Sequence, residues 1–136
     1  MTALASITAV RPTSNTVSAL VMYGATISAG QSVYLDAADS KYKLADANST
    51  AAIAVIKGIA MTPGVDAGYG YVATAGSIIL VGTTAAIGTT YYVGQTAGSI
   101  VPDSDLTTSD YVSRIGTAAS ATQIDLAIKA TAIVHA

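Results

Sequence analysis

Apolar and polar residues alternate over short segments, and turn-forming residues separate these segments about every ten positions. The alternation is clear in Val17-Ser18-Ala19-Leu20-Val21 and in Ile124-Asp125-Leu126-Ala127-Ile128, and a period of two is that of a half-buried strand. Val, Ile, Thr and Tyr favour strands, and helix signals are poor throughout the chain. The pattern predicts a single all-β domain, either a β-sandwich or a barrel.

The predicted strands lie between the turn residues. They are Val17–Tyr23, Ser32–Asp36, Tyr42–Ala45, Ile53–Met61, Gly70–Ala73, Ser77–Val81, Thr90–Val93, Tyr111–Ile115 and Ile124–Ala130. Residues 45–52 contain several helix-tolerant residues, and one short helical turn is the alternative there. The glycine-rich stretch Gly64 to Gly76 lacks the pattern of a phosphate-binding loop, so we interpret it as a flexible or functional loop.

The chain resembles itself when it is shifted by 58 residues. The shift places Leu20–Gly24 on Ile78–Gly82, Gly30 on Gly88, Tyr34-Leu35 on Tyr92-Val93, and Gly58-Ile59-Ala60 on Gly116-Thr117-Ala118. Glycines match at turns and aliphatic residues match in strands. We therefore predict two pseudo-repeated β-halves, residues 17–60 and 75–118, which close one core about a pseudo-two-fold axis because neither half can bury its apolar face alone.

Residues 1–16 fall outside this repeat and precede the predicted β-domain, residues 17–136. Leu4, Ile7 and Val10 make the segment partly apolar, and Arg11 is followed by a proline, which cannot donate to a strand ladder. Two interpretations follow. The segment is either an arm that contacts a neighbouring subunit through Leu4, Ile7, Val10 and Arg11, or an added edge strand.

The low content of charged residues limits the classes of function that fit the chain. Charged residues make up 10% of the chain, against about 25% in an ordinary soluble domain, and every acidic residue is an aspartate. So few charges cannot cover an ordinary surface, which predicts that part of it lies against partners, including further copies of the chain. The net charge of −2 argues against nucleic acid and anionic membranes as partners.

Candidate catalytic chemistry is sparse. His135 is the only histidine and lies next to the C-terminus of the sequence, and no Gly-x-Ser-x-Gly nucleophile motif is present. We assign no catalytic and no cofactor-binding residues, and we expect that the protein is not an enzyme.

Aspartates form the best candidate for a metal site. Asp103, Asp105 and Asp110 could supply oxygen ligands to Ca²⁺, but the chain has no Glu with which to close an EF-hand loop. Aspartates in such loops more often accept backbone N–H bonds. We favour turn capping here and at Asp36 and Asp39, and we assign no metal ligands, although a Ca²⁺ ion at Asp103 and Asp105 stays open.

The aromatic residues are all tyrosines, eight in number. Tyr34 and Tyr92 occupy equivalent positions in the repeat, and we expect their rings to point inward. Tyr69 and Tyr71 are the candidate exposed aromatics, which could stack on sugars or contact a protein.

The order of several segments along most of the chain resembles the head decoration, or cement, proteins of tailed bacteriophages. The segments are Ala29-Gly30-Gln31-Ser32-Val33-Tyr34-Leu35-Asp36, Tyr42-Lys43-Leu44-Ala45-Asp46-Ala47, Gly58-Ile59-Ala60, Gly88-Thr89-Thr90-Tyr91-Tyr92-Val93, Thr96-Ala97-Gly98-Ser99-Ile100-Val101-Pro102 and Asp110-Tyr111-Val112-Ser113-Arg114-Ile115-Gly116-Thr117-Ala118.

The resemblance implies a structural protein on the outer surface of the virion. Such a protein would bind the major capsid protein, bridge capsid subunits and form a homotrimer, and it would carry no catalytic residues. The alternative is a carbohydrate- or receptor-binding β-module of a phage fibre or surface protein, which would use exposed tyrosines.

Overall fold

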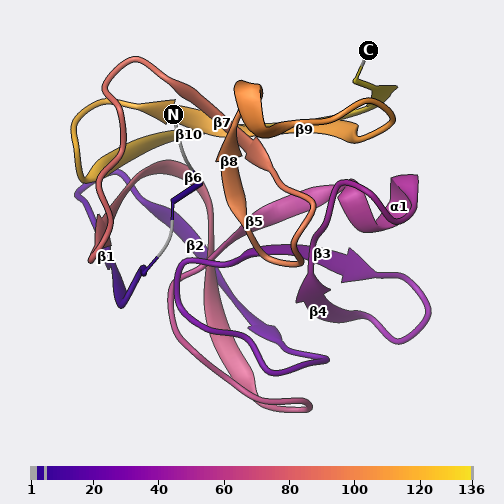
Figure 1. Cartoon of the computed structure of the whole chain (residues 1–136). Helices are drawn as coiled ribbons and strands as arrows, with labels where there is room; N and C mark the ends of the chain where they lie inside the picture. Colours follow the sequence, from indigo (N-terminus) through magenta and orange to yellow (C-terminus); the bar gives the residue numbers. More distant parts are fainter. Residues whose placement is uncertain (1–2, 5, 136) are drawn as a thin grey trace.

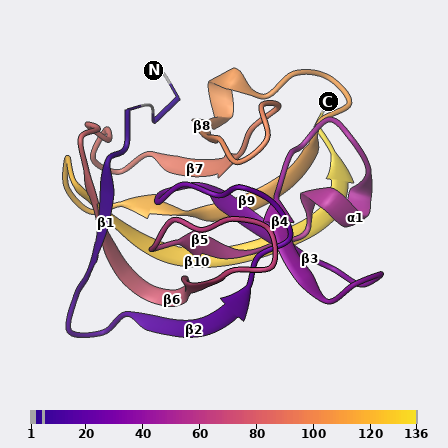
Figure 2. The ribbon, with the colours of Figure 1, turned by 90° about the horizontal axis from the view of Figure 1, so that it is seen from below.

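The computed structural model describes residues 3–4 and 6–135, and β-strands dominate it (Figure 1). The elements are β1 (Ala9–Pro12), β2 (Val17–Met22), β3 (Ser32–Asp36), β4 (Lys41–Leu44), α1 (Ala51–Ala54), β5 (Ile56–Ala60), β6 (Tyr69–Val81), β7 (Thr90–Val93), β8 (Ile100–Pro102), the short 3₁₀ turn η1 (Asp103–Asp105), β9 (Tyr111–Ala118) and β10 (Gln123–Val134). The strands form one curled antiparallel sheet, a half-barrel (Figure 2). The all-β prediction is confirmed.

The long strand β6 joins the two halves of the sheet. Its first part pairs with β2 on one side and β5 on the other, and its last part pairs with β1 and β10. The strand order is therefore β2-β6-β5-β3-β4 in the first half and β6-β10-β9-β7-β8 in the second. The sequence predicted two separate strands here, because Gly76 reads as a break; its positive φ of 79° marks the point where the pairing partners change.

The register of the second half repeats that of the first. The pairs Ser32↔Ile59, Val33↔Gly58 and Tyr34↔Ile56 correspond to Thr90↔Thr117, Tyr91↔Gly116 and Tyr92↔Arg114, with a bulge at the same step. Strands β3 and β4 likewise pair as β7 and β8 do. Gly30 and Gly88 share a positive φ. The predicted equivalence of these glycines, and of Gly58 with Gly116, is confirmed.

The predicted shift fails by one residue at the first strand of each half. Ile78 and Leu80 are buried, whereas Leu20, which the shift places on Ile78, is 59% exposed. Strand β2 instead directs Val21 inward, where it packs against the cluster around Tyr23. A one-residue offset moves every side chain of the strand to the other face.

The N-terminal segment is an edge strand of the sheet. Residues Ala9–Pro12 pair with the end of β6, and the proline lies at the last position of β1, where an edge strand tolerates it. Before β1, the Leu4 N–H donates to the Ile100 carbonyl oxygen at 2.9 Å. Leu4 and Val10 are buried in the core. Residues 1, 2 and 5 of the predicted arm lie outside the described residues.

Tyr23 organises the smaller of two apolar clusters. Its ring is buried with Ile27, Val33, Ala60 and Val72, and its hydroxyl donates to the Thr62 carbonyl oxygen at 2.8 Å. Burial raises the pKa of this hydroxyl. A Cβ at Gly64 or at Gly70 would collide with the ring. The glycine-rich stretch therefore lets the chain approach Tyr23 closely. The interpretation of Gly64 to Gly76 as a flexible or functional loop is wrong from Tyr69 onward, where β6 begins.

One helical turn delays the start of β5. The sequence predicted a strand from Ile53, but the Thr50 side chain accepts a hydrogen bond from the Ile53 N–H at 3.3 Å and caps the turn Ala51–Ala54. The strand begins at Ile56 instead. Among the described residues, no helix is long and apolar enough to cross a membrane.

Candidate functional surface

An exposed apolar patch lies across strands β2 and β6. In the register of these strands, Leu20 faces Tyr71 and Met22 faces Tyr69, so the four side chains share one face of the sheet. Leu20 is 59% exposed, Tyr69 63% and Tyr71 49%, and Met22 is half-buried. We call these four residues the β2–β6 patch. The tyrosines are exposed as the sequence predicted, but Leu20 was expected in a half-buried strand.

The strands beneath this patch carry no charge. Residues 12–35 contain no Asp, Glu, Lys or Arg, and neither do residues 67–102. Because these strands carry no charged side chain, covering the patch does not require the removal of water from an ion. Burial of its apolar area against a partner is therefore favourable.

The four predicted N-terminal contacts separate into two groups. Leu4, Val10 and the half-buried Ile7 pack against the chain's own core, whereas Arg11 is exposed. Gly30 explains the position of Ile7, because a Cβ at Gly30 would collide with the Ile7 side chain. Arg11 is the candidate whose side chain is available to a partner.

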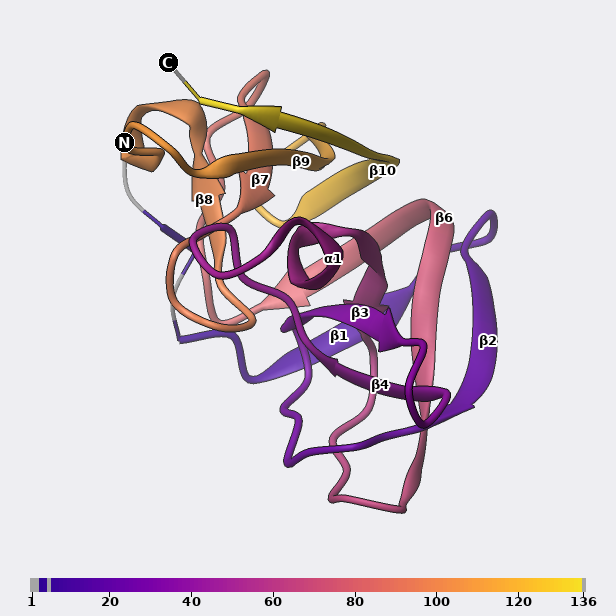
Figure 3. The ribbon, with the colours of Figure 1, turned by 90° about the vertical axis from the view of Figure 1, so that its right-hand side faces the viewer.

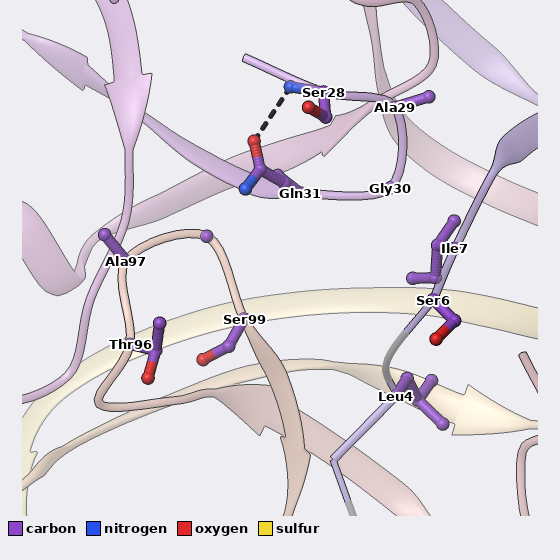
Figure 4. Close-up of a pocket in the computed structure, with 11 residues that line it drawn as sticks. Leu4, Ser6, Ile7, Ser28, Ala29, Gly30, Gln31, Thr96, Ala97 and Ser99 are labelled. Carbon is purple, nitrogen blue, oxygen red and sulfur yellow. Dashed lines mark hydrogen bonds between the residues drawn. The ribbon is translucent and has the colours of Figure 1, made fainter. Parts of the chain in front are cut away.

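A groove of about 260 Å³ lies beside the N-terminal segment (Figure 4). Three segments contribute to its lining: Leu4, Ser6 and Ile7 of the N-terminal segment, residues 28–31, and the turn at residues 96–99. Its polar groups are Ser and Thr hydroxyls and the Gln31 side chain, whose Oε1 accepts a hydrogen bond from the Ser28 N–H at 2.8 Å. The lining side chains include no acid, base or charged group, so the groove offers hydrogen bonds and apolar contact.

Asp110 is a buried carboxylate that holds the loop between η1 and β9. Its Oδ2 accepts hydrogen bonds from Gln95 Nε2 at 2.6 Å, from the Thr107 N–H at 2.8 Å and from the Thr107 hydroxyl at 3.0 Å. These hydrogen bonds tie the Asp110 carboxylate to its own loop. The capping interpretation of this aspartate is confirmed, and no group of three or more potential metal-ligating side chains occurs among the described residues.

We expect Asp110→Ala to destabilise the protein by about 1–3 kcal/mol, because it leaves several buried donors without an acceptor. The measurement is the urea midpoint of unfolding. Asp66→Ala is the matched control, since Asp66 is exposed and its one described ion pair, to Lys41 at 3.5 Å, lies at the surface. Equal midpoints for the two variants would contradict the loop-holding role.

The backbone of His135 is hydrogen-bonded to the end of the same loop, at Ser109 and Asp110. Its backbone N–H donates to the Asp110 carbonyl oxygen at 2.7 Å, and its carbonyl oxygen accepts from the Ser109 N–H at 3.1 Å. Its Nε2 lies 3.7 Å from Asp103 Oδ1. The His135 side chain therefore lies beside the exposed carboxylate of Asp103, directly after the end of β10.

The aspartates of the β3–β4 hairpin cap their turn. Asp36 accepts from the Ala38 N–H at 2.9 Å and Asp39 from the Lys41 N–H at 3.1 Å, as predicted. The Lys43 ammonium lies 2.7 Å from Asp36 and 3.1 Å from Asp39. Its hydrogen bonds lower the pKa of both carboxyls, and the two carboxylates raise the pKa of Lys43.

Comparison of the chain with family models, with curated proteins and with solved structures finds no match.

Proposed function

We propose that the protein is a structural subunit that attaches to the outer surface of a tailed-phage head and stabilises the shell by bridging capsid subunits. The observation that carries the proposal is the β2–β6 patch on strands without charge. Support also comes from the low charge content of the whole chain and from the resemblance of its ordered segments to head decoration proteins.

Such a subunit acts through the surface that it buries. Exposed apolar side chains occur at several further positions of the described chain, namely Val17, Leu35, Val65, Ile87, Ile133 and Val134. Together with the patch they give a subunit of this size apolar contacts on more than one element, which bridging two shell subunits requires. The major capsid protein is the proposed partner, and the homotrimer that the resemblance implies stays a prediction.

The test is binding to phage heads assembled without a decoration protein. Purified protein should co-sediment with expanded heads, appear at repeating positions on their surface in electron micrographs, and raise the temperature at which the heads release DNA. Tyr71→Lys should weaken co-sedimentation, because it places a charge on the patch. Folded protein that does not bind any expanded head would contradict the proposal.

The carbohydrate-binding alternative has one specific observation in its favour. Tyr69 and Tyr71 project from the same face of β6 and are exposed, and such rings can stack on sugars. A glycan array separates the two functions. Glycan binding that Tyr69→Ala removes, in protein that ignores phage heads, would support the alternative.

A further inference from the structure

Three basic side chains point outward from neighbouring parts of the sheet. Lys57 lies on β5, Arg114 on β9 and Lys129 on β10, and all three are exposed. The residues on either side of Lys57 and of Arg114 are buried, so these two side chains point away from the core. Ile128, beside Lys129, packs against the core, which directs Lys129 outward as well. We call these three residues the basic cluster, and they are half of the six lysines and arginines of the chain.

Strands β5 and β10 approach each other along one edge of β6, and β1 and β2 occupy the other edge. Strand β5 pairs with β6 as far as Ala73, and β10 pairs with it as far as Gly76. Continued by one or two residues, these registers bring Lys57 and Ala127 to the same position of β6, Ala75. The two strands are in contact. Figure 3 shows β9 and β10 side by side along the top of the molecule, with α1, which leads into β5, beneath them.

The Ala127 carbonyl oxygen holds the Arg114 side chain in place. Arg114 Nε donates to it at 2.8 Å, where the β9–β10 register shifts between Leu126 and Lys129. This bond uses Nε alone, and the guanidinium carries further N–H donors on its two Nη atoms. Lys129 is the direct partner of Arg114 in the register, so the two basic side chains are neighbours on one face of the sheet. Like charges in directly opposite positions repel each other.

No acidic side chain neutralises the basic cluster within the described part of the chain. Its three members form no ion pair there, and the described ion pairs involve Lys41, Lys43 and His135 instead. Three positive charges therefore lie together without a counter-charge, although the net charge of the chain is −2. A carboxylate from a partner would accept charge-assisted hydrogen bonds from the cations on β9 and β10 and would offset their repulsion.

We propose that the basic cluster is the docking site for an acidic side chain of the protein to which this subunit attaches. The inference rests on the proposed function, under which that protein is the major capsid protein, and it adds a charged contact to the apolar β2–β6 patch. In this contact the partner's carboxylate lies between the Arg114 guanidinium and the Lys129 ammonium. Lys57 adds a third positive charge beside it, so the charges of the two surfaces are complementary.

Nucleic acid fits the basic cluster less well than an acidic protein surface does. Binding to a phosphate backbone depends on positive charges at many phosphates, and the cluster supplies few. Asp125 is exposed on the same side of β10, two residues from Ala127, and it would repel a chain of phosphates that ran along the strand. A protein surface can place one carboxylate at the cluster and an uncharged or basic group opposite Asp125.

Binding to empty expanded phage heads tests the site. The variant Lys57→Gln/Lys129→Gln removes two positive charges and keeps the hydrogen bond between Arg114 and Ala127. It should weaken co-sedimentation with the heads at least about fivefold in about 50 mM salt, because it removes two exposed ionic contacts. The difference from wild type should shrink in about 500 mM salt, since salt screens exposed charges.

The matched control is Lys41→Gln/Lys43→Gln, which changes the net charge by the same amount away from the cluster. Its two lysines already pair with aspartates of their own chain, so the affinity for heads should stay within about twofold of wild type. Circular dichroism checks that both variants are folded.

The comparison separates failure of the site from failure of the proposed function. Wild-type protein that binds heads no more tightly than Lys57→Gln/Lys129→Gln would overturn this inference and leave the proposed function intact, as would an equal loss in the control variant. Wild-type protein that binds no head would overturn both. A labelled double-stranded DNA oligonucleotide is the second probe. Wild-type binding to it that the cluster variant loses would assign the site to nucleic acid and overturn the inference.

Discussion

Removal of residues 1–12 should leave the protein unfolded or close to it at room temperature. The deletion takes Leu4 and Val10 out of the core and strips β1 from the edge of β6. Loss of one buried Leu side chain costs about 2–5 kcal/mol, and a domain of this size has a total stability of about 5–15 kcal/mol. Far-UV circular dichroism and a urea titration of the truncated chain provide the measurement.

Two point variants separate core packing from a partner-binding role. Leu4→Ala should lower the free energy of unfolding by about 2–4 kcal/mol, whereas Arg11→Ala should change it by less than about 0.5 kcal/mol, because Arg11 is exposed. A truncated chain with the urea midpoint of the full protein would instead show that the segment is a detachable arm. That result would support the interpretation of the segment as an arm that contacts a neighbouring subunit.

The fate of this segment shows what the sequence pattern could and could not indicate. Leu4, Ile7 and Val10 are spaced three residues apart, so they show no strand alternation, and the proline after Arg11 discourages a strand assignment. The pattern established that the segment is apolar and lies outside the repeat. Whether its apolar side chains are buried in the same chain or in a partner depends on long-range contacts with β6 and β8, which no local pattern contains.

Strands that follow a glycine turn were predicted well. The bounds of β3 and β7 agree with the prediction, because Gly30 and Gly88 mark the preceding turns. Errors occurred where a glycine has a different purpose. Gly70 makes room for the Tyr23 ring, and Gly76 lies within β6, so a glycine-rich sequence concealed a long strand.

The candidate surface was predicted only in part. Tyr69 and Tyr71 were predicted as the candidate exposed aromatics, and both are exposed. Leu20 was missed because alternation identifies two faces of a strand without showing which face the sheet covers.

Gly58→Ala and Gly116→Ala should each destabilise the protein by about 3 kcal/mol or more, at the upper end of the range for overpacking. These glycines are equivalent in the repeat, and each lies at a bulge opposite its partner strand. A Cβ at Gly58 would collide with the Ala73 carbonyl oxygen, and one at Gly116 with the Asp125 carbonyl oxygen. Backbone atoms of a paired strand cannot turn aside as a flexible side chain can.

The matched control for these variants is Gly88→Asn. Gly88 has a positive φ of 81°, a conformation that Asn tolerates better than other residues with a side chain, and a Cβ there would have nothing within 4 Å. We expect a loss below about 1 kcal/mol. Urea unfolding of the three variants therefore shows whether a steric collision or the backbone conformation is what makes replacement of a glycine destabilising. If Gly58→Ala and Gly116→Ala unfold at the same urea concentration as Gly88→Asn, close approach of the strands is not the reason that the repeat carries glycine at this position.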